Sequence, residues 1–183
     1  MSCSSAPLVA DPWSSAATRA AGAARPVSRS GDDDGDGLLT AIATGLASVA
    51  LPWELATGEH PAERQFQLLI ATDVYDAWLV HWPVGTGLDL HDHGGSAGAF
   101  AVVAGDLDED VVRDGRTVTT RVGPGASVVF GQGHVHAVVN RGSLGATSVH
   151  VYSPPLTSMG YYRHQAGGGL VAQRVESVTL TSP

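Results

Sequence analysis

From Glu63 onward the chain consists of short segments rich in β-branched and aromatic residues, divided by Gly, Pro and Asp at intervals of about ten residues. This spacing predicts a mainly β fold of short antiparallel strands in a closed or sandwiched arrangement, a jelly-roll β-barrel or a small barrel. Trp78 and Trp82, four positions apart, are expected to pack its interior. The segments predicted to be strands are 65–71, 77–82, 88–91, 97–104, 107–113, 116–121, 127–130, 135–140, 147–153 and 170–181.

The N-terminal part of the chain has a different character. Residues 1–36 are rich in Ala, Ser, Gly and Asp, a composition that buries too little apolar surface to offset the entropy of ordering. We expect a flexible leader there and one domain over residues 37–183. Between Leu38 and Leu55 the apolar residues recur at helical spacing, and Pro52 interrupts the run. This predicts a short helical portion, an amphipathic helix followed by a second short helix to about Thr57.

Composition excludes several classes of partner. The net charge is -8, and the ten basic residues are all arginines without a basic run, so we expect no nucleic acid and no anionic membrane as partner. The single cysteine, Cys3, permits no intramolecular disulfide. No apolar run reaches the length of a membrane helix, and residues 1–30 lack the pattern of a secretory signal. These features predict a cytoplasmic protein.

Histidines occur in two pairs with one residue between them, His91 with His93 and His134 with His136. Successive side chains of a strand point to opposite faces, so the histidines of each pair aim their imidazoles the same way. This is a metal-binding geometry, and the residues alone leave all four histidines as candidate ligands. Asp92 should point away from the metal and act as a hydrogen-bond acceptor in the turn or behind the ligands.

The segment 147–153 alternates cleanly. Val149 and Val151 face one way, whereas Ser148, His150 and Tyr152 face the other. If the polar face points into a barrel, these three hydrogen-bonding groups form a site.

Two blocks resemble the motifs of the cupin superfamily. The block Gly85–Asp106 contains the first histidine pair and resembles the first motif, and Gly123–Asn140 resembles the second. The resemblance implies a jelly-roll barrel in which a histidine of the second block completes a metal site. In ordinary cupins a glutamate also follows the first pair as an anionic ligand, but here Ala97 and Gly98 occupy those positions. A site of neutral imidazoles leaves the full charge on the metal and favours anionic substrates.

Within the cupins, the chain is similar to the cysteine dioxygenase family of thiol dioxygenases. The resemblance runs from Arg64 to Pro155, and the motifs that carry it are Leu90-His-Asp-His93, the Gly105 turn, Val135-His136-Ala-Val-Val-Asn140 and Ser148-Val-His150-Val-Tyr152-Ser-Pro-Pro155. It implies oxidation of L-cysteine by O2 to cysteine sulfinic acid, with one Fe(2+) per chain. The implied partners are a small-molecule thiol and O2, and we expect a monomer.

The resemblance also implies a set of metal ligands, which are His91, His93 and His136. It favours His136 over His134, because His136-Ala-Val-Val-Asn140 matches the family motif. His134 would then be a neighbour of the pocket or a surface residue.

Catalytic and substrate-binding residues follow from the same resemblance. Ser148 would fix the imidazole of His150, which would orient Tyr152. The Tyr152 hydroxyl would donate a hydrogen bond near the oxygen or the substrate carboxylate, and Arg64 would pair with that carboxylate. The Ser153–Pro154 bond is expected to be cis.

The sequence departs from the family pattern near two of these residues. Animal enzymes carry a cysteine, cross-linked to the tyrosine, where this chain has Gly98, so Tyr152 should be unmodified. Related 3-mercaptopropionate dioxygenases use glutamine in place of the arginine, and Gln65 and Gln67 lie close to Arg64. A dioxygenase for 3-mercaptopropionate or another small thiol is therefore one alternative. A non-catalytic metal- or ligand-binding cupin is an alternative of another class.

Overall fold

The computed structural model describes residues 33–165 and 169–179. In these ranges two helices, α1 (Asp33–Val49) and α2 (Trp53–Thr57), precede a run of strands. The strands are β1 (Gln65–Ala71), β2 (Asp76–Trp82), β3 (Gly87–His91), β4 (Ala97–Ala104), β5 (Leu107–Arg113), β6 (Arg116–Val122), β7 (Ser127–Phe130), β8 (His136–Val139), β9 (Ala146–Ser153), β10 (Ser158–His164) and β11 (Leu170–Ser177). The expected mainly β architecture with a short helical N-terminal portion is confirmed.

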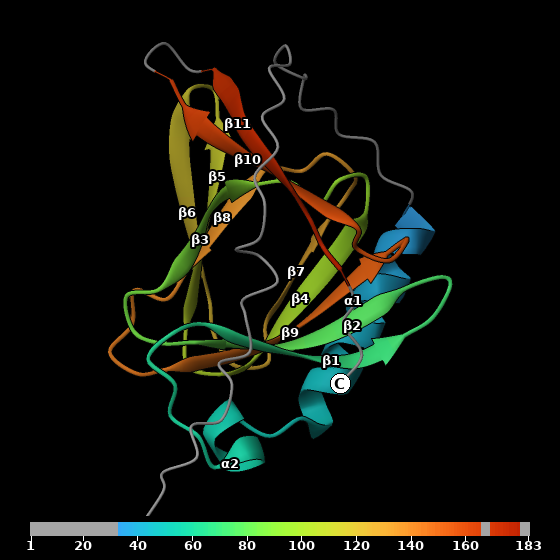
Figure 1. Ribbon diagram of the computed structural model, residues 1–183, viewed down its shortest axis with the longest axis vertical. Helices are drawn as coiled ribbons and strands as arrows, with labels where there is room; N and C mark the ends of the chain where they lie inside the picture. The colour runs from blue at the N-terminus through green and yellow to red at the C-terminus, as the bar shows by residue number, and fades with distance from the viewer. Residues whose placement is uncertain (1–32, 166–168, 180–183) are drawn as a thin grey trace, which may run out of the picture.

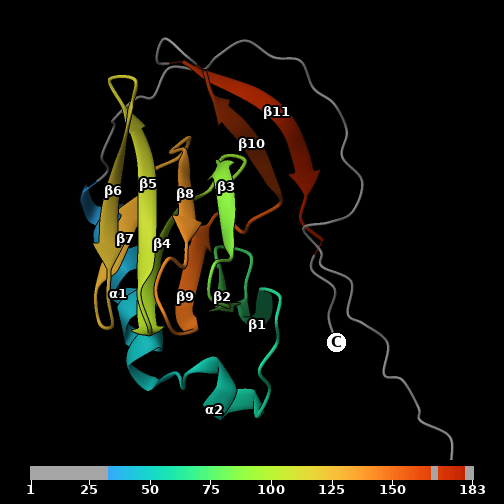
Figure 2. The same ribbon diagram turned by 90° about the vertical axis from the view of Figure 1, so that its left-hand side faces the viewer.

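The strands form two antiparallel sheets, one ordered β1-β2-β9-β4-β7 and the other β11-β10-β3-β8-β5-β6. The two sheets face each other, as the two perpendicular views show (Figures 1 and 2). Large side chains from both sheets fill the space between them, including Trp82, Phe100, Leu107, Val138 and Met159. Trp78 belongs to this core as well, so both tryptophans pack the interior as predicted.

Helix α1 covers the outer face of the five-stranded sheet (Figure 1). Leu39 and Ala43 are buried there against Val149 and Val151, which gives the apolar face of β9 its cover. The helix begins at Asp33, inside the segment 1–36 that was expected to be flexible, and residues 1–32 lie outside the described ranges. No helix among the described residues is long and apolar enough to cross a membrane.

Strand β10 has no counterpart among the predicted segments. It lies between β11 and β3, and Tyr161 pairs with His91 across the β10–β3 boundary. Strand β11 ends at Ser177 rather than at residue 181, and residues 180 and 181 lie outside the described part of the chain. Because β10 borders β3, it also borders the first histidine pair.

Candidate metal centre

Three histidines meet between the sheets. His91 ends β3 and His136 begins β8, and the antiparallel pairing of these strands places the two opposite each other. His93 follows β3 in the next turn, and its ring centroid lies 5.0 Å from that of His91 and 5.1 Å from that of His136. All three side chains are buried, and each offers a ligand nitrogen within 4.8 Å of the others. This group can converge on a single ion.

The hydrogen bonds of these histidines suit a metal. Nδ1 of His91 donates to the carbonyl oxygen of Asp89 at 2.7 Å, and Nδ1 of His136 donates to Oε1 of Glu109 at 2.7 Å. Each of these two rings therefore keeps Nε2 as a lone-pair donor. Neither ring nitrogen of His93 has a hydrogen-bond partner among the described residues, although both are buried. Buried polar atoms normally have a partner, and a metal ion would supply one.

Burial also sets the charge of the three rings. It lowers the pKa of His91, His93 and His136, and the neighbouring imidazoles lower these pKa values further. The rings are therefore neutral at pH 7, which is the form that binds a metal. Three neutral imidazole donors fit a divalent first-row ion such as iron or zinc.

His134 lies beside the three-histidine group, with its ring centroid 5.0 Å from that of His136. Nε2 of His134 lies 3.4 Å from Oε1 of Glu109. Glu109, His134 and His136 form a second cluster of potential ligands, which shares His136 with the first. His134 is thus a neighbour of the site through Glu109.

Glu109 is a site residue that the sequence analysis missed. It lies on β5, where the register places it opposite Val138 and places Val111 opposite His136, so these side chains share the inner face. Burial alone would raise the pKa of Glu109, but the hydrogen bond from His136 and the close contact with His134 lower it to about 2. The carboxylate is therefore ionised at pH 7.

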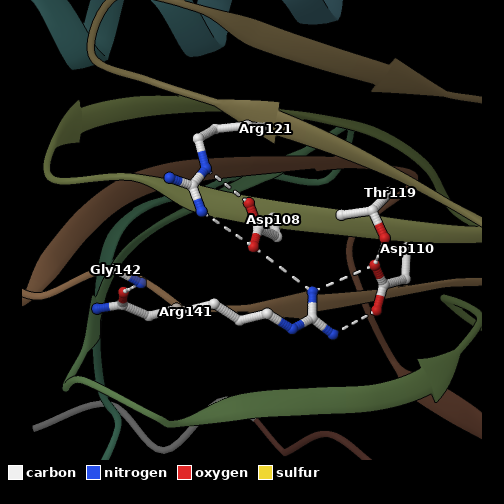
Figure 3. Close-up of polar contacts among 7 residues, drawn as sticks. Asp108, Asp110, Thr119, Arg121, Arg141 and Gly142 are labelled. Atoms are coloured by element: carbon white, nitrogen blue, oxygen red, sulfur yellow. Dashed lines mark hydrogen bonds and ion pairs between the residues drawn. The ribbon is translucent and has the colours of Figure 1, made fainter.

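The neighbours of Glu109 on the strand face outward. Asp108 accepts hydrogen bonds from Arg121, and Asp110 accepts them from Arg141, which also lies 3.6 Å from Asp108 (Figure 3). This network ties β5 to β6 and to the end of β8. Strand alternation then leaves Glu109 directed inward, and that alternation was the signal available in the sequence.

The polar face of β9 points into the barrel. Oγ of Ser148 lies 2.9 Å from Nε2 of His150, and the Tyr152 hydroxyl lies 3.3 Å from Nδ1 of the same ring. Phe100 stacks on His150 with ring centroids 5.1 Å apart. Burial lowers the pKa of His150 to about 3 and raises that of Tyr152, so the imidazole is neutral and the phenol protonated.

A small cavity of about 30 Å³ adjoins both groups. Its lining includes His91, His150, Tyr152 and Arg64, together with the apolar walls Phe66, Trp78, Val80, Trp82, Leu88, Val138 and Met159. A cavity of this size admits only a compact ligand. His91 of the histidine group thus lines the same cavity as His150 and Tyr152 of the β9 group.

The backbone of β1 decides which polar side chain reaches this cavity. Arg64 and Phe66 both line it, whereas Gln65 and Gln67 alternate to the other face and are absent from its lining. The Arg64 guanidinium lies 5.4 Å from the ring centre of Trp82, and its Nη1 donates to the carbonyl of Gly87 at 3.1 Å. The cavity lining therefore includes the arginine and neither of the two glutamines.

Gly98 is opposite Tyr152 in the β4–β9 register. A Cβ atom at Gly98 would lie 2.6 Å from the ring of Phe130 and 2.8 Å from the carbonyl oxygen of Val151. Phe130 in turn stacks on His93, with ring centroids 4.5 Å apart. The aromatic ring thus fills the space that a side chain at position 98 would need, and packs a candidate ligand.

The turn between the first two histidines is held by Asp92. Its carboxylate accepts hydrogen bonds from the backbone N–H of Gly94 at 3.0 Å, from that of Gly160 at 3.1 Å and from the Tyr162 hydroxyl at 2.5 Å. Asp92 therefore acts as a hydrogen-bond acceptor, as predicted, and fastens the turn to β10.

A second buried carboxylate holds the chain after Tyr152. The Ser153–Pro154 bond is cis, as predicted, and the following N–H of Leu156 donates to Oδ2 of Asp76 at 3.0 Å. Asp76 is fully buried, and its Oδ1 has no hydrogen-bond partner among the described residues. Burial raises the pKa of Asp76 to about 6, although the Leu156 hydrogen bond opposes the shift.

Two antiparallel sheets around an inward-facing three-histidine group define this protein as a two-sheet β protein with a candidate metal centre. The comparison with protein families is more specific. The family model for cysteine dioxygenase type I matches residues 38–165, which is most of the chain, and the chain belongs to this family. Membership supports a thiol dioxygenase activity, which uses a small-molecule substrate and O2.

Solved structures with a similar fold are distant in sequence. The Schizosaccharomyces pombe Cnp3 cupin domain shares 15% identity over 54% of this chain and 70% of its own, with a TM-score of 0.47. A cupin superfamily protein from Desulfitobacterium hafniense shares 12% identity over 56% of this chain and 88% of its own, also with a TM-score of 0.47. An oxalate oxidase in complex with glycolate shares 18% identity over 51% of this chain and 52% of its own, with a TM-score of 0.44. No curated protein matches the chain in sequence.

Proposed function

We propose that this protein oxidises L-cysteine with O2 to cysteine sulfinic acid, with one Fe(2+) per chain held by His91, His93 and His136. The observation that carries the proposal is the position of Arg64, which lines the same small cavity as His91 and Tyr152. A cation, a protonated phenol and a metal-ligand group thus surround one space. This set suits a compact substrate with a carboxylate at one end and a thiol at the other.

Arg64 binds the substrate carboxylate in this proposal. A guanidinium offers two parallel N–H donors to a carboxylate, and the pair is strong where water is excluded. Phe66 and Trp82 supply apolar walls of the cavity that the arginine lines. Gln65 and Gln67 face away, which supports cysteine over 3-mercaptopropionate as the substrate.

Tyr152, His150 and Ser148 position the reacting end of the substrate. Tyr152 stays protonated at pH 7, because burial raises its pKa, and its hydroxyl donates a hydrogen bond into the cavity. His150 holds the phenol oxygen, and Ser148 holds the imidazole. A ferrous ion at the histidines would activate O2 and favour the thiolate form of the substrate.

The test is anaerobic reconstitution with Fe(2+), followed by O2 uptake and product analysis with L-cysteine and with 3-mercaptopropionate. We expect sulfinate formation from cysteine at one O2 per product, and loss of activity in the His91→Ala control, which removes a ligand. Arg64→Ala should lower kcat/KM for cysteine by about tenfold to a hundredfold, because a charge-assisted contact is lost. Preference for 3-mercaptopropionate would identify the related enzyme, and metal binding without thiol-dependent O2 uptake would identify a non-catalytic cupin. Either result would overturn the proposal.

A further inference from the structure

Trp82 extends the polar group of β9 by one member. Its indole Nε1 donates to Oγ of Ser148 at 2.8 Å, so four side chains form a continuous hydrogen-bonded chain from Trp82 through Ser148 and His150 to Tyr152. Trp82 is 1% exposed and Ser148 is fully buried. The two meet because β2 and β9 are adjacent strands with Val80 opposite Ser148. Water therefore does not compete for these bonds.

The first bond of this chain has only one possible direction. An indole N–H is a donor and never an acceptor, so the Ser148 oxygen must accept from Trp82. The other contact of that oxygen among the described residues is Nε2 of His150, at 2.9 Å. The Ser148 hydroxyl can therefore place its own proton in a hydrogen bond by donating to Nε2.

The hydrogen bond from Ser148 then decides which ring nitrogen of His150 carries the proton. Its imidazole is neutral and carries one ring proton. If Nε2 accepts from Ser148, that proton is on Nδ1, which donates to the Tyr152 oxygen 3.3 Å away. The phenol oxygen is thus an acceptor toward His150, and its own proton remains available.

The opposite direction leaves a buried donor without a partner. If Nε2 of His150 carried the proton, the Ser148 oxygen would accept from both neighbours, and its hydroxyl proton would have no acceptor among the described residues. Buried donors are rarely left unpaired, because burial removes their hydrogen bonds to water and no protein acceptor replaces them. In that arrangement the Tyr152 hydroxyl would also donate its hydrogen bond to Nδ1 of His150 and could not donate it into the cavity.

We propose that Trp82 is a positioning residue which sets the direction of this chain, so that the Tyr152 hydroxyl donates its proton into the cavity. The inference rests on the proposed function, because it concerns the hydrogen bond that Tyr152 offers to an anionic substrate or to oxygen. Trp82 has a second role through its ring face, which lies against the Arg64 guanidinium. One side chain therefore supports both the carboxylate anchor and the tyrosine.

The tautomer of His150 can be measured independently of enzymatic activity. The experiment is 15N NMR of the full-length chain, labelled at histidine and loaded with diamagnetic Zn(2+), with His150 assigned by comparison with His150→Gln. We expect the Nδ1–H tautomer in the wild type. In Trp82→Phe the Ser148 hydroxyl loses its donor and can turn, so the Nε2–H form becomes detectable. The control is Trp53→Phe, because the buried indole nitrogen of Trp53 has no partner among the described residues.

Kinetics of the iron-loaded enzyme provide a second readout. Phe at position 82 keeps an aromatic face for Arg64 but offers no N–H. Trp82→Phe should therefore lower kcat about tenfold and change KM less than about threefold. The inference is overturned if wild-type His150 carries its proton on Nε2, or if Trp82→Phe retains the wild-type tautomer. Failure of the proposed function would instead appear as absent sulfinate formation with the NMR result intact.

Discussion

Glu109 accepts a hydrogen bond from Nδ1 of His136 at 2.7 Å, across the boundary between β5 and β8. The cupin motif that the first histidine pair resembles would place a glutamate on the metal, where this chain has Ala97 and Gly98. Glu109 supplies a negative charge behind the candidate ligand His136, on the side of the imidazole ring that faces away from the metal site. A carboxylate behind a histidine ligand fixes its orientation and makes its free nitrogen a better donor.

Glu109→Gln should weaken metal binding by about tenfold to a hundredfold, because the amide keeps the shape of the side chain but lacks its charge. Chelator competition with Zn(2+) or Fe(2+) measures the dissociation constant. The matched control is Asp110→Asn, which removes a carboxylate from the outer face of the same strand. Equal affinities in wild type and Glu109→Gln would contradict this role.

Gly98→Ala should lower the free energy of unfolding by about 1–3 kcal/mol, because the added methyl group overlaps Phe130 and the backbone of Val151. Movement of Phe130 should also loosen His93, on which it stacks. Urea unfolding and metal titration measure the two effects. Gly131→Ala is the control, because a Cβ there meets nothing within 4 Å. If both variants lose the same stability, the packing explanation is wrong.

The fold could be predicted largely from local pattern, and the exception shows the limit of this approach. The two-residue period of a strand is visible in segments such as Ser148–Tyr152. Strand β10 contains Gly160 and lacks β-branched residues, so its local pattern is weak even though Tyr161 and Tyr162 favour a strand. Its hydrogen bonds come from β3 and β11, and pairing between distant segments is not encoded in local propensity.

The residues of the candidate site also differ in whether the sequence alone could predict their positions. Residues two apart on one strand, such as His150 and Tyr152, could be predicted to share a face from spacing alone. The contact between Glu109 and His136 could not be predicted, because it depends on the register between β5 and β8. The acidic residues on both sides of Glu109 also make the segment resemble a solvated strand. Trp82 was assigned to packing for a related reason, since its N–H partner lies on another strand.

Asp92→Ala should lower the free energy of unfolding by about 1.5–3 kcal/mol, because two backbone N–H groups and the Tyr162 hydroxyl lose a charged acceptor. The turn that carries His93 should loosen with it, so metal affinity should fall in the same variant. Urea unfolding and metal titration measure both. Asp89→Ala is the control, because Asp89 is exposed and holds His91 through its backbone carbonyl, which the variant retains. Unchanged metal affinity in Asp92→Ala would show that the turn does not depend on this carboxylate.

Asp76 should make the protein less stable as pH rises from about 4 to about 6. Its pKa in the folded chain is about 6, above the ordinary value of 3.8, so in this interval the folded state holds a proton that the unfolded state has released. Asp76→Asn cannot titrate, and its amide can still accept from the Leu156 N–H. The gain in unfolding free energy of Asp76→Asn over wild type should therefore grow by about 1–3 kcal/mol between pH 4 and pH 7. Urea unfolding at both pH values measures it, and a gain independent of pH would contradict the raised pKa.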